Sequence, residues 1–235
     1  HILWVVEADE DIALIENTFI SIPSVYVADG HHRTAAAALV GEEMKKNNPS
    51  HNGDEEYNFF LSVLFPDEQL EIIDYNRVVK DLNGLSAQDF ISKLEQSFVV
   101  NEIGESAYRP KTKHQMGMYL ESTWYSLDAN EETYDDNDPI KGLDVSVLSS
   151  CVLEPILNIT DLRRDKRIDF VGGIRGLGEL ERRVDNGEMK VAFAMYPVSL
   201  SELMNIADTG NIMPPKTTWF EPKLRSGLFV HRIDD

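Results

Sequence analysis

The sequence predicts an α/β fold, with α+β as the alternative, in which helices flank a mixed sheet. Segments with a strand pattern alternate with segments that have a helix pattern, and the apolar segments 57–65 and 189–195 are typical of central strands. A chain of 235 residues is long enough to bury a sizeable core. We expect one domain over residues 1–235, or two packed lobes of about 1–127 and 140–235 joined by an acidic loop.

The first part of the chain predicts the order strand, helix, strand, helix. Residues 2–6 (ILWVV) have the pattern of a buried strand, and the acids that follow are typical of the first turn of an amphipathic helix. Residues 25–27 (VYV) are β-branched or aromatic and predict a second strand. The dipeptide Asp29-Gly30 is a turn signal, and the Ala-rich run after it predicts a helix to about Lys46.

The middle of the chain predicts several strands around one amphipathic helix. Residues 86–96 (SAQDFISKLEQ) have a Ser at the cap position, an acid three residues later and one apolar face. The strand patterns are rich in β-branched and aromatic residues. They occupy residues 57–65, 69–79, 98–101, 116–120 and 123–127.

The C-terminal part continues the alternation after an acidic run. Residues 128–139 (DANEETYDDNDP) lack the ligand order of an EF-hand and favour a solvated loop. Helix patterns occupy residues 144–157, 177–184 and 199–207, and strand patterns occupy residues 168–171, 189–195, 213–223 and 227–233. Gly172-Gly173, between a strand and a helix, is a candidate backbone cradle for phosphate, with a tight connection as the alternative.

Composition limits the class of partner. The chain has 41 acidic against 22 basic residues and a formal net charge of -19, which argues against a nucleic-acid partner. We expect no membrane partner either, because no apolar run approaches spanning length. The lone Cys151 lies in an apolar run, which predicts a buried side chain and fits the reducing cytoplasm. Because a strand pattern begins directly at His1, we expect the C-terminal part of a longer protein.

Residues 24–39 (SVYVADGHHRTAAAAL) hold the clearest chemistry, because strand, turn, two histidines, an arginine and helix meet there. A helix that begins at such a turn presents open backbone N–H groups and the positive end of its dipole. Arg33 can bind a phosphate through two parallel N–H bonds, and a histidine can donate another bond or move a proton. The simpler alternative is that Asp29 caps the helix and that Arg33 and the histidines form an exposed first turn.

Residues 213–225 place three cations in an otherwise acidic chain, and these cations are Lys216, Lys223 and Arg225. Glu221 adds a carboxylate to the same segment. On a strand, neighbouring side chains point to opposite faces, so only some of them could line one pocket. The alternative is an edge strand protected by its lysines.

Three segments carry a resemblance to a known family: ADGHHR at 28–33, KRIDFVGG at 166–173 and MPPKTTWFEPKLRSGL at 213–228, the last of the form MPPK-x-x-x-FEPK-x-x-x-GL. Together they resemble a widespread bacterial family described as a conserved domain of unknown function. Gly-x-His-Arg after a strand is also similar to the phosphate-binding turn of the ParB and sulfiredoxin-like superfamily, which includes ATP-binding enzymes and a kinase of free serine. This likeness implies a ParB/sulfiredoxin-like element around residues 24–46. Thr34 stands where the commoner form has an aromatic residue, so no ring stacking is carried over to it.

From the residues and the resemblance we expect a nucleotide-dependent phosphotransferase, or kinase, that acts on a small hydroxylated metabolite such as free serine. The expected cofactors are Mg²⁺ and ATP or ADP. The expected cofactor-binding residues are Gly30, His31, His32, Arg33, Lys216, Lys223 and Arg225. The expected catalytic residues are Asp29, His32 and Glu221, with Asp29 also as a metal ligand.

Two other functions stay open at this point. A non-catalytic sensor of a nucleotide or anionic metabolite needs the basic groups but no positioned carboxylate. A metal-dependent hydrolase would use Asp29, His31, His32 and His114, although adjacent histidines on a helix point about 100° apart. In every case the expected partner is a small phosphate-containing or anionic ligand, and a homodimer is left open.

Overall fold

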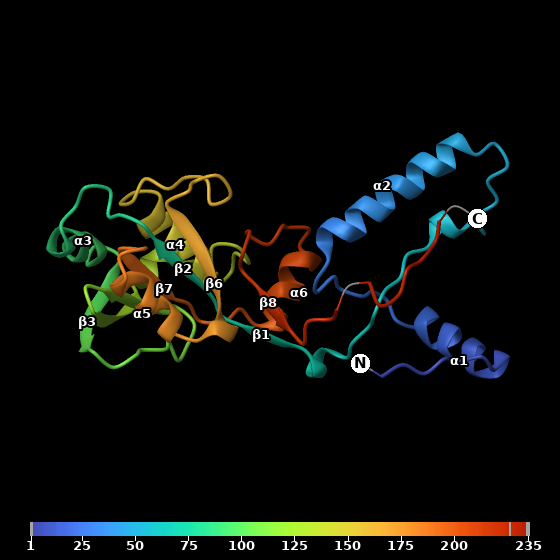
Figure 1. Ribbon diagram of the computed structural model, residues 1–235, viewed down its shortest axis with the longest axis horizontal. Helices are drawn as coiled ribbons and strands as arrows, with labels where there is room; N and C mark the ends of the chain where they lie inside the picture. Colours follow the sequence, from blue (N-terminus) through green and yellow to red (C-terminus); the bar gives the residue numbers. More distant parts are fainter. Residues whose placement is uncertain (1, 226, 234–235) are drawn as a thin grey trace. The chain divides into compact units, whose positions relative to one another are not determined.

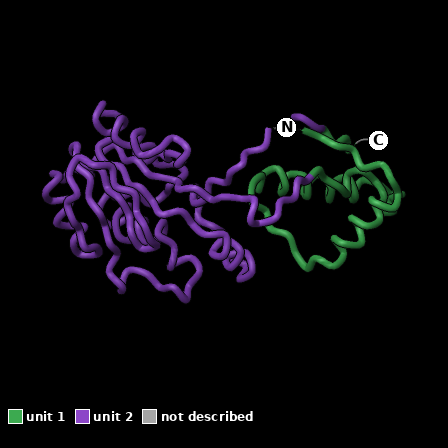
Figure 2. Tube along the Cα trace, turned by 90° about the horizontal axis from the view of Figure 1, so that it is seen from below, with its two compact units in different colours: residues 1–61, 230–235 green, residues 62–229 purple. Residues whose placement is uncertain are grey.

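The computed structural model describes residues 2–225 and 227–233, and the chain divides into two compact units (Figure 2). The first unit comprises His1–Leu61 and Val230–Asp235, and the second comprises Ser62–Phe229. The acidic run 128–139 lies inside the second unit.

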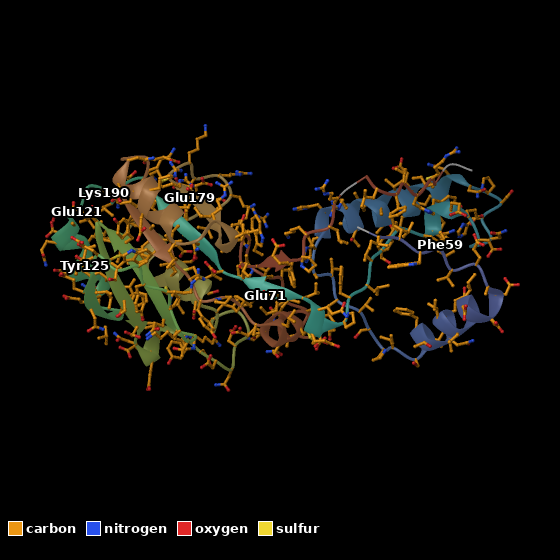
Figure 3. The ribbon with its side chains drawn as sticks, turned by 60° about the horizontal axis from the view of Figure 1, so that its bottom comes forward. Phe59, Glu71, Glu121, Tyr125, Glu179 and Lys190 are labelled. Atoms are coloured by element: carbon orange, nitrogen blue, oxygen red, sulfur yellow. The ribbon has the colours of Figure 1, made fainter. Side chains whose placement is uncertain are left out.

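A six-stranded antiparallel sheet is the framework of the second unit (Figure 1). Its strands follow the order β3-β5-β4-β7-β2-β6. Their bounds are β2 (Tyr75–Val79), β3 (Phe98–Gly104), β4 (Gln115–Leu120), β5 (Thr123–Ala129), β6 (Ile168–Gly172) and β7 (Val191–Ala194). The central strand β7 pairs with β2 and β4, and the hairpin β4-β5 turns at Glu121 and Ser122, which both have positive φ. Lys190 and Glu121 form an ion pair of 2.7 Å (Figure 3).

Alternation along the strands gives the sheet two apolar faces. Val79, Met118 and Phe193 belong to the larger buried cluster, together with side chains of α3 (Ala87–Leu94), α4 (Asp144–Leu148) and α6 (Leu200–Asp208). The neighbouring residues on the strands belong to the smaller cluster, which α5 (Gly178–Asp185) covers through Leu180. The sheet is therefore buried on both faces, and this explains why β7 is apolar throughout.

A two-stranded sheet leads into the large one. β1 (Glu71–Ile73) pairs antiparallel with β8 (Trp219–Glu221) (Figure 1), and in this register Ile72 lies opposite Phe220. The chain then passes Asp74 and enters β2. Residues near 74 and residues near 219 therefore lie side by side in the fold, although they are far apart in the sequence.

The first unit contains α1 (Asp9–Ile20), α2 (His31–Asn47) and the 3-10 turn η1 (Glu56–Asn58). Tyr57 is its buried residue among those described, and its hydroxyl bonds to Asn48 Nδ2 at 3.0 Å and to His51 Nδ1 at 2.9 Å. A Cβ at Gly41 would lie 2.7 Å from the Tyr57 carbonyl oxygen. Only glycine allows α2 to approach that carbonyl so closely.

The expected fold class is confirmed, and most of the expected elements exist. Ser86 caps α3 by accepting a bond from the Asp89 N–H, as the sequence predicts. The helix after Gly30 ends at Asn47, within one residue of the expected end. The strands β3 to β7 and the helices α5 and α6 all fall within segments that the patterns predict, with small differences at their ends. In the described part of the chain, no helix combines the length and the apolar character that a membrane crossing requires.

Several expected strands are wrong. The segments 2–6, 25–27, 57–65 and 227–233 carry no strand in the structure, and most of their apolar side chains are exposed rather than buried. The physical reason is that a strand needs a partner, and among residues 2–225 and 227–233 none pairs with these segments. The segment 213–223 forms a strand only over its last part, because Lys216 has a φ of 57°.

Two further expectations need correction. The sheet contains antiparallel pairs only, so its pairing matches the α+β alternative rather than a mixed sheet. The expected helix over residues 144–157 is also interrupted, because α4 ends at Leu148 and a π-helical turn, Ser149–Leu153, follows it. Such turns widen the helix by one residue and frequently occur at functional sites.

Candidate functional site

The turn at residues 29–33, here called the Gly30 turn, has the geometry of an anion site. Gly30 has φ 89° and ψ 22°, which is the left-handed region that glycine adopts most easily, and it directly precedes α2. Its N–H donates to Asp29 Oδ1 at 2.8 Å. Asp29 therefore holds the backbone of the turn, and the residue at the helix cap position itself carries no side chain.

The first turn of α2 offers backbone donors. Thr34 N–H makes the first helical bond, to the Gly30 carbonyl at 3.0 Å. In the described structure no group accepts a hydrogen bond from the backbone N–H of His31 or His32, and both imidazole side chains are exposed. Open N–H groups at the positive end of a 17-residue helix favour a bound anion.

Arg33 lies against this turn. A Cβ built on Gly30 would come within 3.3 Å of Arg33 Nη2, so the guanidinium folds back over the glycine. The side chain thereby places a permanent positive charge close to the open N–H groups of the helix start. The Gly30 turn thus combines backbone donors, a guanidinium and two imidazoles within five residues of sequence.

The expected cations of the second unit rest on aromatic rings. Lys216 Nζ lies 5.7 Å from the centre of the Tyr75 ring, and Lys223 Nζ lies 5.4 Å from the centre of the Trp219 ring. Such contacts stabilise a cation without neutralising its charge. Arg225 is exposed.

Glu221 is bound on both carboxylate oxygens. Oε1 accepts from Trp219 Nε1 at 2.8 Å, and Oε2 accepts from the backbone N–H of Lys223 at 3.1 Å. Both carboxylate oxygens are thus engaged by hydrogen-bond donors of the same segment. The geometry gives Glu221 a clear structural task, which is to fix the segment around β8.

A buried cluster that the sequence patterns miss lies beside this segment. Asp74 is almost fully buried. Its Oδ1 accepts a hydrogen bond from Arg109 Nη1 at 2.6 Å, and its Oδ2 accepts one from Asn76 Nδ2 at 2.6 Å. Asn76 Oδ1 in turn accepts from the backbone N–H of Met195 at 2.9 Å. The signal that could have found this cluster is the polar interruption Asp-Tyr-Asn-Arg within an otherwise apolar strand pattern at 74–77.

Gly172 and Gly173 are required by packing against this cluster. A Cβ at Gly172 would lie 2.6 Å from the Trp219 ring, and a Cβ at Gly173 would lie 2.6 Å from Asp74 Cγ. The Gly173 N–H already donates to the Asp74 carbonyl at 2.7 Å. This favours the tight connection over the phosphate cradle for the pair.

His114 lies in a charged cluster of the second unit. Its ring stacks on Tyr134 with centres 3.5 Å apart, and its nitrogens lie 3.1 Å from Asp136 and 3.3 Å from Asp144. Burial raises the pKa of Asp144 to about 7, although a bond from the His114 backbone N–H acts in the opposite direction. Within the described residues, no group of three or more His, Cys, Asp or Glu side chains is placed to hold a metal ion, which gives the metal-hydrolase alternative no support.

The expected site residues fall into two sets. Residues 29–33 belong to the first unit, whereas Lys216, Glu221, Lys223 and Arg225 belong to the second. A single site formed by both sets stays a prediction.

The comparisons with known proteins give a family and several distant structures. The model of the family described as "Protein of unknown function (DUF1015)" matches residues 1–146, which is more than half of the chain. No match is found among curated proteins.

Among solved structures, a mutant free serine kinase in complex with AMP shares 13% identity at a TM-score of 0.41, over 65% of this chain and 55% of that chain. This chain thus spans little more than half the length of that relative. The free serine kinase in complex with AMP shares 14% identity at a TM-score of 0.42, over 92% of this chain and 81% of that one. A conserved hypothetical protein from Pyrococcus furiosus shares 17% identity at a TM-score of 0.42, over 85% of this chain and 72% of that chain. At TM-scores below 0.5, these likenesses carry no argument about the chemistry of this chain.

Proposed function

The chain belongs to the DUF1015 family of proteins of unknown function, and from this premise we propose that it is a nucleotide-dependent phosphotransferase acting on a small hydroxylated metabolite, free serine being one candidate. The observation that carries the proposal is the Gly30 turn. There the open N–H groups of His31 and His32 and the guanidinium of Arg33 lie together at the start of a long helix. Phosphate groups are the ligands that such a turn binds best.

The residues present fit a magnesium nucleotide. The Arg33 guanidinium lies against Gly30, which has no Cβ, and Asp29 is an exposed carboxylate next to it. Mg²⁺ commonly binds to proteins through one or two carboxylates and through the phosphates themselves, and it would neutralise charge on the phosphate oxygens. Asp29 would hold the ion, while Arg33 and the backbone N–H groups would orient the phosphates.

In the transfer itself, a bond forms between the acceptor hydroxyl oxygen and the terminal phosphorus, and the bond from that phosphorus to the nucleotide oxygen breaks. The hydroxyl proton passes to a base, for which neutral His32 and Asp29 are the candidates in the turn. Lys216, Lys223 and Arg225 are the cations that would stabilise the charge developing on the transferred phosphoryl group. The proposal includes a cytoplasmic location, with no nucleic-acid partner, and it leaves a homodimer open.

One observation favours a second candidate, a non-catalytic sensor of a nucleotide or anionic metabolite. Both oxygens of Glu221 already accept hydrogen bonds, so this carboxylate is poorly placed to serve as a base. A sensor would keep the Gly30 turn and would need no catalytic carboxylate. Asp29→Asn and Glu221→Gln therefore separate the two candidates. A phosphotransferase should lose turnover in these variants, whereas a sensor has no turnover in the wild type either.

The experiment is a thermal-shift screen with phosphate, pyrophosphate, ADP and ATP, each with and without Mg²⁺, followed by ³¹P NMR of mixtures with serine and other small alcohols. We expect a nucleotide to raise the melting temperature only when Mg²⁺ is present. We also expect transfer of a phosphoryl group to one of the alcohols. Binding without transfer to any alcohol would favour the sensor. The absence of any shift would refute both candidates.

A further inference from the structure

Arg77 in β2 is a buried cation, with only 2% of its surface exposed. Its Nη1 donates to the Tyr75 carbonyl, and its Nη2 donates to the Lys216 carbonyl at 2.9 Å. Its guanidinium carbon lies 5.7 Å from the centre of the Phe170 ring. These contacts fix the orientation of the side chain, but both acceptors are neutral.

Among the described residues, the charge of Arg77 has no ion-pair partner. In the described part of the chain, no carboxylate lies within ion-pair distance of its guanidinium, and Asp144 attracts it only from farther away. Burial lowers the pKa of Arg77 to about 10, so the group stays protonated at neutral pH. A buried charge is costly unless it is paired, and the two bonds use two of the five N–H donors of a guanidinium.

Arg77 is one of the residues that line a cavity of about 250 Å³, here called the Arg77 pocket. An adjoining hollow of about 350 Å³ shares lining residues with it, among them Ser149, Glu154 and Pro215. The polar wall comes from the end of α4 and the π-helical turn after it, and the apolar wall comes from the segment before β8. The residues that matter here are Ser146, Ser149, Ser150, Glu154, Pro214 and Pro215.

The serine hydroxyls differ in what they can offer. Ser149 Oγ donates to the Val145 carbonyl at 2.8 Å, and Ser150 Oγ donates to the Val147 carbonyl at 3.3 Å. Ser146 Oγ has no partner among the residues that the structure describes, so its proton is available to a ligand. Two residues of the lining thus carry hydrogen-bond donors, the guanidinium of Arg77 and the hydroxyl of Ser146, and such donors match the oxygens of an anion.

We propose that the Arg77 pocket is a binding site for a small oxyanion, a carboxylate or phosphate group, held by Arg77 and Ser146. Nothing in the proposal depends on the Gly30 turn, which lies in the other unit. Glu154 is an exposed residue of the lining, and its negative charge opposes the binding of an anion.

The test is calorimetric titration with sodium acetate and with inorganic phosphate, at constant ionic strength set by sodium chloride. We expect saturable binding of one of the two, and the stronger one identifies the oxyanion. Ser146→Ala should weaken it by roughly three- to tenfold, because one donor is lost. Glu154→Gln should tighten it by a similar factor, because one opposing charge is removed. Arg77→Gln should abolish it, with folding checked by circular dichroism.

Two controls keep the result specific. Glu95→Gln makes the same charge change at an exposed residue outside the pocket, and it should leave the affinity unchanged. Arg33→Ala removes the cation of the Gly30 turn, so phosphate bound there is lost in this variant, whereas the anion in the Arg77 pocket is kept. The proposal is overturned if neither anion binds saturably, or if Ser146→Ala and Glu154→Gln leave the affinity unchanged. Both outcomes can be observed even if Arg77→Gln does not fold.

Discussion

Asp144 makes the stability of the second unit depend on pH. The carboxyl is 5% exposed at the first residue of α4 and accepts the His114 backbone N–H at 2.8 Å. Lys113 and the His114 ring face it from the segment before β4, and Asp136 and Glu202 face it as negative charges. We predict that Asp144→Asn, which keeps an oxygen for the His114 N–H, stabilises the protein above neutral pH.

The magnitude follows from the pKa. Burial raises the pKa of Asp144 from its ordinary 3.8 to about 7, so between these values the folded state binds more protons than the unfolded state. Stability from this group is therefore complete below pH of about 4 and is lost as the pH rises through about 7. At about 1.4 kcal/mol for each pH unit, the loss amounts to about 4 kcal/mol. The Asn variant has no proton to lose and escapes this change.

The assay is urea unfolding followed by circular dichroism at pH 5 and pH 8, with Glu132→Gln as a control that removes one exposed acid nearby. The advantage of Asp144→Asn in free energy of unfolding should grow by about 2–4 kcal/mol from pH 5 to pH 8. The control should follow the wild type at both values. An equal difference between Asp144→Asn and the wild type at the two pH values would refute the reasoning.

Substitutions at three other positions test the local geometry. Gly173→Ala should lower the free energy of unfolding by about 1–3 kcal/mol, because its Cβ would overlap the Asp74 carboxyl; a variant as stable as the wild type in urea would contradict this. Gly30→Ala should cost about 1–2 kcal/mol, because an L-residue is strained at φ 89°, and nucleotide binding should weaken with it in a calorimetric titration. Ser86→Ala should lower the free energy of unfolding by about 1 kcal/mol, because the cap of α3 is lost. Ser86→Asn keeps an acceptor and should lower it by less in the same urea titration.

Sequence patterns predict elements well where the interactions that form them are local. Ser86 and Asp89 are three residues apart, so the start of α3 can be read directly from the sequence. The Asp29-Gly30 dipeptide likewise predicts a turn, and the glycine has the positive φ that such turns need. The strand patterns of β4 and β5 succeed because the two strands are neighbours in sequence and pair with each other.

The patterns fail where structure depends on distant partners. The apolar run at 57–65 resembles a central strand, but no described segment pairs with it through backbone hydrogen bonds. The polar interruption at 74–77 marks Asp74 and Arg77 as unusual, but it does not identify their partners. Lys216, Gly173 and Arg109 come from elsewhere in the chain. The packing of the Arg33 guanidinium against Gly30 is a matter of side-chain conformation, which no pattern of residue types encodes.

The most direct test of the central claim is calorimetric titration of ATP with Mg²⁺ into the wild type, Arg33→Ala and Lys45→Ala. Lys45 lies in the last turn of the same helix, so its variant makes the same charge change away from the Gly30 turn. We predict saturable binding to the wild type, an affinity at least roughly tenfold weaker for Arg33→Ala, and an affinity close to that of the wild type for Lys45→Ala. Equal affinities for Arg33→Ala and the wild type, or no binding to the wild type, would contradict the account.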